Sequence, residues 1–389
     1  MIEQILTRRN LLQAMGKVQR NHGSAGVDHM PVTKLTELLS IDKEALTARV
    51  RSGRYLPQPI LAVEIGFAEL AGSVPKGNKG DTRLLGIPTV TDRLLQQAVL
   101  QVIMAKFEFE FSESSYGFRP NKSLHQAVQK AHGYINDGFQ DIVDIDLKTF
   151  FDEVDHCYLL QLLYRKVKCQ QTLRLIRKWL RSPIQINGRL VKRRKGIPQG
   201  SPLSPFLANI MLHELDRELE RQGCRFVRYA DDFSVYTEGK AHAREVYNTV
   251  YLFLKNKLKL SINREKSGIR RPANFEILGF GFVPTFVKGE QGKYQLVVSA
   301  KSWAKFKQKL KAITRKTTPM SFDERIRRLN EVQRGWVNNY RMANIQTKLG
   351  KLDSWLRYRL RYCIWHHWKK PDRRRRSLIR MGVEQGKAY

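Results

Sequence analysis

Two adjacent aspartates, Asp231 and Asp232, interrupt a strand-like stretch that runs from Arg225 to Tyr236. Aromatic and β-branched residues flank them, so the pattern predicts a hairpin whose two-residue turn lies at the acids. Such a turn would present both carboxylates at one tip. Because neighbouring carboxylates repel each other, a cation is expected between them, and hard oxygen ligands favour Mg²⁺. The plainer interpretation is a surface turn with two solvated aspartates.

A second acidic strand is predicted upstream, between Asp141 and Asp152. Acidic and aliphatic residues alternate there, which sets Asp144 and Asp146 on one face and aliphatic residues on the other, namely Val143, Ile145 and Leu147. A strand that ends in an acid beside a hairpin tipped by two acids suits two-metal phosphoryl transfer, in which the ions lie about 3.5–4 Å apart. The alternative is an edge strand with a solvated acidic face.

A loop rich in glycine and proline separates these strands and runs from Lys195 to Asn209. Ser204 followed by Pro205 is typical of an N-cap and a first helical position, so a helix is predicted from there to Arg221. Gln199 offers a donor and an acceptor beside glycines that let the backbone approach a flat ligand. A purely structural strand-to-helix turn is the alternative.

The charge balance points to a polyanionic partner. The 389 residues include 70 Lys and Arg against 36 Asp and Glu, a formal net charge of +34. This excess predicts salt-dependent binding to nucleic acid. The length suggests two or three subdomains. No run of about 18 apolar residues and no secretory leader is present, so we expect a soluble, cytoplasmic protein without a membrane partner.

The C-terminal quarter is especially basic. Residues 301–389 hold 25 Lys and Arg against 6 Asp and Glu, a net charge of +19. Helices are predicted over 302–315, 322–343 and 349–369, with breaks at Pro319 and Pro371. Their aromatic residues are interpreted as core rather than as base-stacking platforms, namely Trp303, Phe306, Trp355, Tyr358 and Tyr362. A three-helix bundle with a basic outer surface would suit a nucleic-acid duplex or a folded RNA.

The cysteines are scattered without paired spacing, so neither a disulfide framework nor a zinc site is predicted. Cys363 lies near His366 and His367, but no second pair of ligands accompanies them. We interpret that cluster as part of a packed or RNA-facing helix.

The order of the segments resembles reverse transcriptases encoded by group II introns, over nearly the whole chain. The matching blocks begin with Asn10–Ala14 and Gly26–Asp28 and continue through Leu85–Arg93, Ser115–Pro120, Asp146–Asp152, Gly196–Asn209, Tyr229–Asp232, Leu260–Ser267 and Ile277–Phe280. The C-terminal segments Gly335–Tyr340, Leu352–Arg361 and Trp368–Pro371 resemble the family's thumb or maturase domain.

The resemblance implies an α/β fold, a right-hand polymerase with fingers, an antiparallel-sheet palm and a basic three-helix thumb. The expected divisions are an N-terminal extension over 1–50, fingers over 51–134, a palm over 135–285 with interleaved fingers elements, a thumb over 286–372 and a basic tail over 373–389. Family members often continue with a DNA-binding region and a nuclease module. The chain stops about where these would begin, so we expect no target-strand cleavage by this polypeptide.

Residue roles follow from the same resemblance. The metal ligands would be Asp146, Asp231 and Asp232, holding Mg²⁺ or Mn²⁺ in its place, with Lys266 as a fourth catalytic residue that contacts the phosphates or protonates pyrophosphate. The nucleotide would be bound by Lys76, Arg83, Phe151 and Gln199. Phe151 would exclude a 2′-hydroxyl, and Lys79 is an alternative to Lys76 because the family's usual lysine-to-arginine spacing is not kept here. Nucleic acid would contact Arg119, Lys195, Arg373, Arg374, Arg375 and Arg376.

The implied function is RNA-directed DNA polymerisation by two-metal-ion nucleotidyl transfer. Expected partners are an RNA template, a DNA primer or RNA–DNA duplex, deoxynucleoside triphosphates and structured intron RNA. Alternatives are a host-adopted enzyme of repair or phage defence, and an RNA-binding splicing cofactor with incidental polymerase activity. An RNA-templated RNA polymerase is disfavoured because Phe151 is bulky where a ribonucleotide would have to fit.

Overall fold

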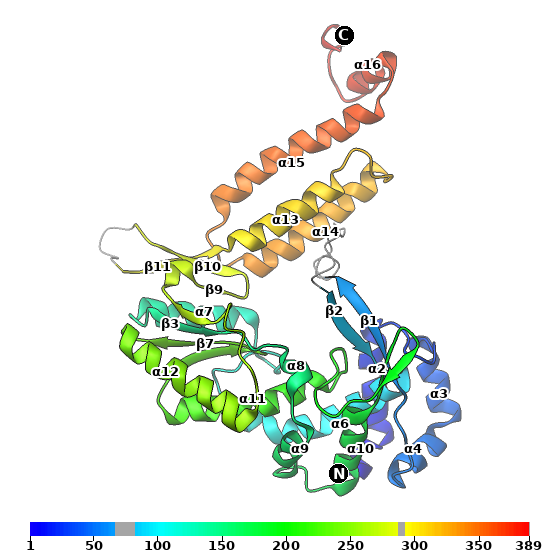
Figure 1. The fold of residues 1–389 in the computed structure, drawn as a ribbon. Coiled ribbons are helices and arrows are strands. Elements are labelled where there is room, and N and C mark those ends of the chain that lie inside the picture. The colour runs from blue at the N-terminus through cyan, green and yellow to red at the C-terminus, as the bar shows by residue number, and fades with distance from the viewer. Residues whose placement is uncertain (67–81, 287–291, 389) are drawn as a thin grey trace. The chain divides into compact units, whose positions relative to one another are not determined.

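The computed structural model describes residues 1–66, 82–286 and 292–388. The chain divides into two compact units: unit 1 comprises Met1–Ile65 and Gly80–Phe275, and unit 2 contains Glu276–Tyr389. Both units mix helices with sheets (Figure 1). The expected α/β class is therefore confirmed, and the finer division into fingers, palm, thumb and tail stays a prediction.

The N-terminal part of unit 1 is helical. Its helices are α1 (Ile2–Ile5), α2 (Arg8–Arg20), α3 (Leu35–Ile41), α4 (Lys43–Arg51) and α6 (Val90–Phe107). Helices α2 and α6 pack together, and Asn10 joins them: its Nδ2 donates to the Ala98 carbonyl at 2.9 Å and its Oδ1 accepts from Gln101 at 2.7 Å. The N-terminal helices are thus tied to the body of unit 1.

The central sheet of unit 1 is four-stranded, antiparallel and ordered β6-β7-β3-β8. The strands are β3 (Asp141–Ile145), β6 (Arg225–Tyr229), β7 (Asp232–Thr237) and β8 (Gly268–Arg270). Helices α7 (Leu124–Asn136), α11 (Ser204–Arg221) and α12 (Lys240–Phe253) pack against it (Figure 1). Val143, Ile145 and Val235 are buried, so the aliphatic face of β3 is covered as the alternation predicts.

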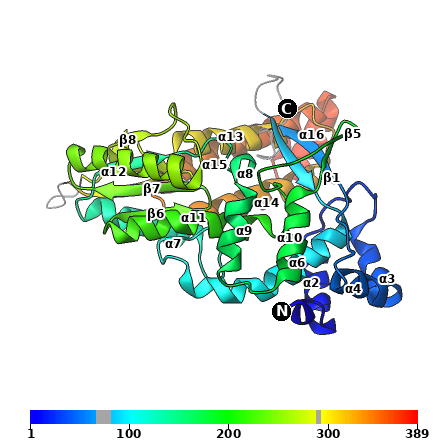
Figure 2. The same cartoon turned by 60° about the horizontal axis from the view of Figure 1, so that its bottom comes forward.

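A second sheet of unit 1 has the order β2-β1-β4-β5 and pairs β1 with β4 in parallel. Its strands are β1 (Ile60–Gly66), β2 (Thr82–Ile87), β4 (Ile184–Ile186) and β5 (Arg189–Val191). Three helices lie between β3 and β4 in sequence, namely α8 (Phe150–Glu153), α9 (His156–Tyr164) and α10 (Gln170–Arg181). Helices α9 and α10 lie side by side (Figure 2).

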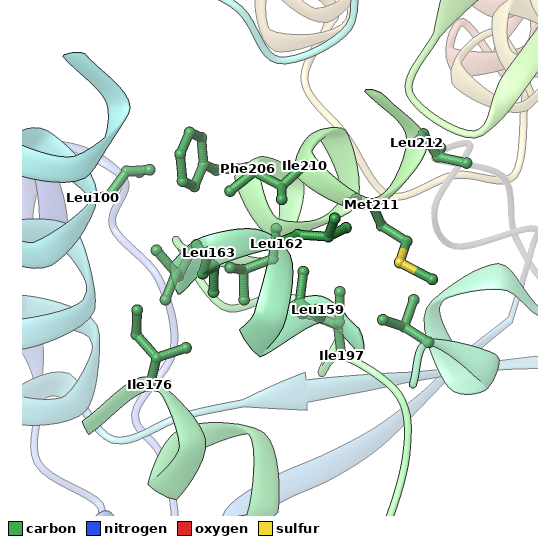
Figure 3. Packing of buried hydrophobic residues seen from close by; sticks show 14 of the residues in the cluster. Leu100, Leu159, Leu162, Leu163, Ile176, Ile197, Phe206, Ile210, Met211 and Leu212 are labelled. Atoms are coloured by element: carbon green, nitrogen blue, oxygen red, sulfur yellow. The ribbon is translucent and has the colours of Figure 1, made fainter. Parts of the chain in front are cut away.

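One apolar core joins these helices. Leucines of α9 pack with residues of α6, α10 and α11, among them Leu162, Ile176 and Phe206 (Figure 3). Burial of such side chains contributes about 25 cal/mol per Å² of apolar surface removed from water. This core sets α11, and the loop before it, against the helices that follow β3.

A buried carboxylate cross-links three segments of the same core. Asp92 on α6 accepts hydrogen bonds from Tyr55 Oη and Trp179 Nε1, each at 2.8 Å, and from Thr89 Oγ1 and the Gln58 amide. Burial raises the pKa of Asp92, and these hydrogen bonds oppose that shift. Asp92 therefore fixes α10 and the segment before β1 onto α6.

Unit 2 combines a small sheet with helices. The strands are β9 (Glu276–Ile277), β10 (Phe280–Pro284) and β11 (Tyr294–Val298), and the helices are α13 (Ala300–Ile313), α14 (Phe322–Tyr340), α15 (Gln346–His367) and α16 (Pro371–Arg380). The first three helices confirm the predicted ones within a few residues. The sheet was not predicted, and Pro371 begins α16 rather than only ending α15, since a proline is tolerated at the first helical position.

The core of unit 2 is partly aromatic. Phe306 stacks on Trp336 with ring centroids 4.1 Å apart, and Trp303 packs edge-on against both rings. Tyr358 and Tyr362 do not join this core: they are 71% and 49% exposed. Helix α15 buries the stripe Leu352, Leu356 and Cys363, which places both tyrosines on another face.

No helix in the described ranges is long and apolar enough to cross a membrane.

We expect Asp92→Ala to lower the free energy of unfolding of unit 1 by roughly 3 kcal/mol or more, because each buried donor left without an acceptor costs about 1–3 kcal/mol. Urea denaturation measures the change. Asp137→Ala, at an exposed helix end, is the matched control and should stay within about 0.5 kcal/mol of the parent. An unchanged midpoint for Asp92→Ala would contradict the cross-linking role.

Candidate active site

The three candidate metal-binding aspartates lie at one end of the central sheet. In the antiparallel pair β3–β7, Ile145 lies opposite Phe233, and Asp146 is the next residue after β3. Continuing that register by one residue sets Asp146 opposite Asp232. Tyr229 pairs with Asp232 at the closed end of the β6–β7 hairpin. The register therefore brings Asp146, Asp231 and Asp232 to the same sheet edge.

The predicted hairpin exists, but its turn lies one residue earlier than expected. The two turn residues are Ala230 and Asp231, and Asp232 is already the first residue of β7. Ala230 adopts a positive φ of 60°, which costs a non-glycine residue roughly 1–2 kcal/mol. The turn thus sits where a small residue, and not an aspartate, takes the left-handed conformation.

The donor chemistry of this edge fits a divalent cation. Carboxylate oxygens are the ligands that Mg²⁺ and similar hard ions prefer. Within residues 1–66, 82–286 and 292–388, however, no three His, Cys, Asp or Glu side chains converge closely enough to hold a metal ion. Three carboxylates repel one another unless a positive charge lies between them. Sheet register thus sets the acids at the same end of the sheet, and their role as metal ligands stays a prediction.

The segment Leu260–Ser267, called the strap below, precedes β8 and binds the backbone of Asp146. The Asp146 amide donates to Ser267 Oγ at 3.0 Å, and the Asp146 carbonyl accepts from the Asn263 amide at 2.8 Å. The same strap carries Lys266, whose Nζ lies 4.0 Å from Asp146 Oδ2. Both side chains are partly exposed, so this pair is available to an incoming ligand. The predicted neighbours Asp146 and Lys266 are brought together.

Asp144, which shares the acidic face of β3, is engaged elsewhere. Arg270 Nε donates to its Oδ2 at 2.8 Å. Burial raises the pKa of Asp144, and the hydrogen bond and charge of Arg270 oppose the shift. Asp144 therefore forms an ion pair with Arg270 on the neighbouring strand of the same sheet.

Two backbone hydrogen bonds join the loop of Gln199 to the helical turn of Phe151. The Gly196 amide donates to the Val154 carbonyl at 2.7 Å, and the Ile197 amide donates to the Phe151 carbonyl at 2.6 Å. Gly196 has φ +86°, and a Cβ there would lie 2.8 Å from the Asp152 carbonyl oxygen. A glycine is required at this close approach. The half-buried side chains of Phe151 and Gln199 are consequently carried by segments that are bonded to each other.

The far side of the same loop contacts β2. The Gly86 amide donates to the Gln199 carbonyl at 2.7 Å, and a Cβ on Gly200 would lie 2.5 Å from the Gly86 carbonyl oxygen. Ser204, expected as an N-cap, is instead the first residue of α11 and donates through Oγ to the Pro198 carbonyl at 2.6 Å. The loop is thus fixed at both ends.

Three predicted cationic ligands of the nucleotide fall at or beyond the limits of the described residues. Arg83 lies in β2 by its backbone, and its side chain is not described. Lys76 and its alternative Lys79 lie outside the described residues. Their assignment stays a prediction.

Arg119, which was predicted to contact nucleic acid, is buried instead. Its Nε donates to Glu108 Oε1 at 2.9 Å, and its Nη1 donates to the carbonyls of Ser112 and Ser115. Only 8% of Arg119 is exposed, so its guanidinium serves to shape the loop before it. Lys195, by contrast, is exposed and pairs with Glu153 at 2.8 Å, and its nucleic-acid role stays a prediction.

The four arginines from Arg373 to Arg376 lie on α16 and do not share one face, because consecutive helical residues point about 100° apart. Arg374 is turned inward, with Nε donating to the Trp368 carbonyl at 2.8 Å and Cζ 4.6 Å from the Trp365 ring centroid. Arg373 and Arg376 are exposed. Arg373 and Arg376 are therefore the arginines of this run that we still expect to contact phosphates.

Sequence reasoning missed the residues that support the turn at Asp231. A Cβ on Gly117 would lie 2.2 Å from the Ala230 amide nitrogen, so the backbone of that loop lies flat against the turn. Arg228, on β6, is fully buried beside the turn. The signal in the sequence was a charged residue inside an apolar strand, since a buried arginine requires partners.

Two family models and several known proteins match this chain. Residues 303–382 match the group II intron, maturase-specific domain. Protein YkfC of Escherichia coli is 29% identical over 63% of this chain and 71% of its own length. The group II intron-encoded protein LtrA of Lactococcus lactis subsp. cremoris is 30% identical over 58% of this chain, and the match spans about half of its length, 47%. The retron Mx65 reverse transcriptase of Myxococcus xanthus is 28% identical over 51% of this chain and 47% of its length.

A second family model matches residues 74–282, more than half of the chain, and includes the loop of Gln199 and all three aspartates at the sheet edge. The chain belongs to the reverse transcriptases, the RNA-dependent DNA polymerases.

Proposed function

We propose that this reverse transcriptase extends a primer 3′-hydroxyl on an RNA template, with Asp146, Asp231 and Asp232 as ligands of Mg²⁺, for which Mn²⁺ can substitute. The observation that supports this is the register of β3 and β7, which sets Asp146 opposite Asp232 beside the hairpin turn. Divalent ions held there would activate the attacking hydroxyl and stabilise the leaving phosphate.

The remaining roles belong to side chains around this edge. Lys266 is close enough to Asp146 to reach phosphates bound beside it, and it would donate a proton or a positive charge to pyrophosphate. Gln199 would contact the incoming deoxynucleoside triphosphate, while Arg83 and Lys76 would bind its phosphates. Phe151 packs edge-on against Phe150 with ring centroids 5.3 Å apart, and this contact would hold its ring against the sugar.

We further propose that unit 2 binds structured intron RNA, which supports a splicing role beside polymerisation. The maturase-specific match over 303–382 and the net charge of +19 over residues 301–389 favour it. The partners would be the RNA template, a DNA primer or RNA–DNA duplex, and the intron. Activity on these partners would take place in the cytoplasm, at the nucleoid when the target is DNA.

Primer extension on a defined RNA template tests the polymerase site. Asp231→Ala should abolish incorporation and leave RNA binding nearly unchanged, because it removes a metal ligand and not a basic surface. Glu265→Ala, an exposed acid on the strap near Asp146, should extend the primer normally. Extension by Asp231→Ala would refute the metal assignment. A parent protein that binds RNA tightly and never extends the primer would favour the splicing role alone.

Phe151→Val should admit ribonucleotides, since it removes the ring that would meet a 2′-hydroxyl. We expect kcat/KM for a ribonucleotide, relative to the matching deoxynucleotide, to rise roughly 10- to 100-fold. Single-nucleotide incorporation with both substrates measures this ratio. If sugar discrimination stays at the parental value while the variant remains active, Phe151 is not the gate.

Replacing Arg373 and Arg376 with alanine should weaken binding of intron-like RNA and flatten its salt dependence. The log–log slope should fall by about 0.7–0.9 for each phosphate that the protein no longer neutralises. Binding measured across salt concentrations gives the slope. Arg327→Ala is the control, because Arg327 is exposed on α14 but paired with Glu324 and Glu331. Equal slopes for the double variant and the parent would return both arginines to ordinary solvated surface.

A further inference from the structure

Arg228 uses every N–H group of its guanidinium inside unit 1. Nε and Nη2 donate to the two carboxylate oxygens of Asp216 at 2.7 and 2.5 Å. Nη2 also donates to Ser115 Oγ at 2.7 Å, and Nη1 donates to Asn209 Oδ1 and to the Ala230 carbonyl, each at 2.9 Å. A guanidinium has five such donors, so Arg228 is saturated. Arg228 and Asp216 are both 0% exposed.

The acceptor of most consequence is the Ala230 carbonyl. It belongs to the same planar peptide as the amide of Asp231, so the hydrogen bond from Arg228 fixes the orientation of that peptide. Ala230 has φ +60° and lies in the turn. A residue held in this sparsely populated conformation persists only where its surroundings determine it. Arg228 supplies that constraint from inside the sheet.

The loop around Ser115 constrains the turn from the other side. The Arg228 amide donates to the Ser114 carbonyl at 2.9 Å, and the Tyr116 amide donates to the Arg228 carbonyl at 2.8 Å. Gly117 then lies against Ala230, where a Cβ would clash. Asn209 on α11 joins both supports, because its Nδ2 donates to the Gly117 carbonyl at 2.9 Å while its Oδ1 accepts from Arg228.

We propose that Arg228, Asp216 and Asn209 are positioning residues that set the direction of the Asp231 carboxylate and thereby the affinity of the site for its divalent cation. This inference rests on the proposed function, in which Asp231 is a metal ligand. Stability alone does not explain the arrangement, because a buried ion pair is often no more stabilising than apolar side chains of the same volume. What apolar residues cannot supply is a planar donor set that holds a carboxylate, an amide and the turn carbonyl together.

The test is Mn²⁺ binding, followed by the electron paramagnetic resonance signal of free Mn²⁺ in the absence of nucleic acid. The informative variants are Arg228→Lys, which keeps the charge and loses the planar donor set, and Asn209→Ala, which removes the link to Gly117. We expect the Kd for Mn²⁺ to rise about tenfold in each, as for partners that orient metal ligands elsewhere. In primer extension kcat should fall at fixed Mg²⁺, while KM for the deoxynucleotide stays near the parental value.

Arg325→Lys is the matched control for disturbing a buried arginine. Arg325 lies in unit 2, is 1% exposed and donates to the backbone carbonyls of Ile313, Arg315 and Thr318. It should lower the Tm and leave the Kd for Mn²⁺ unchanged. If Arg228→Lys fails to fold, Asn209→Ala decides the question alone, since it leaves the Arg228–Asp216 pair in place.

Asp231→Ala, measured in the same titration, tests the metal site separately from the positioning role. Weak Mn²⁺ binding by Asp231→Ala together with parental binding by folded Arg228→Lys and Asn209→Ala would overturn the positioning role and keep the metal site. Parental binding by Asp231→Ala would overturn the metal site, and the positioning role with it. Weakened binding in all three variants, with Arg325→Lys unaffected, is the expected result.

Discussion

The register between β3 and β7 is the constraint on which the active site depends. Side chains alternate along a strand, so a slip of one residue would move the whole acidic set to the other face. The slip is opposed by apolar side chains on the buried face, because Val143 and Ile145 of β3 pair with Val235 and Phe233 of β7 and all are buried. The same burial that stabilises the sheet therefore sets Asp146 opposite Asp232. Function at this edge follows from core packing a few residues away.

Close backbone approaches at three glycines join the loops around this sheet edge. Gly196 lies against the turn of Phe151, Gly200 against β2, and Gly117 against the hairpin turn. At each position a Cβ would lie within 2.8 Å of a neighbouring backbone atom. The loops that carry Gln199 and Phe151 can approach each other this closely because glycine has no Cβ. Backbone contacts thus hold these segments together, and the segments carry the polar side chains of the candidate site.

Much of this could be predicted from the sequence. Period-two alternation indicated β3, and aromatic and β-branched residues around the two aspartates indicated the hairpin of β6 and β7. Proline and glycine indicated the loop before α11, and apolar spacing indicated three helices of unit 2. Local patterns were insufficient where a distant residue decides. The hairpin turn lies one residue earlier than predicted, at Ala230 and Asp231. Ala230 has a positive φ there, its carbonyl accepts from Arg228, and Gly117 packs against it. Arg119 is buried, contrary to the expectation of a nucleic-acid contact, because its guanidinium turns back onto the carbonyls of Ser112 and Ser115, and residue types alone do not predict that loop conformation.

The exposed tyrosines of α15 likewise show that helical spacing alone does not predict which face of a helix is buried. Tyr358 and Tyr362 share a face, as their spacing requires, but the partners of α15 cover the stripe of Leu352, Leu356 and Cys363. Spacing tells which residues lie together and not which face is covered. The covered face is decided by how α13 and α14 pack, which is a long-range property.

The basic residues act on polyanions in two ways, through long-range attraction and through direct phosphate contacts. The net charge of +34 sets the long-range attraction of the chain for polyanions, and a buried arginine that donates to backbone carbonyls, such as Arg325, still adds to it. Phosphate contacts require a guanidinium or ammonium group that reaches solvent, and Arg119, Arg228 and Arg325 do not. Arg228 adds to neither effect, because Asp216 cancels its charge inside the protein. The rate of association with RNA therefore follows the total charge, whereas the salt dependence of affinity follows only the cations that reach the surface.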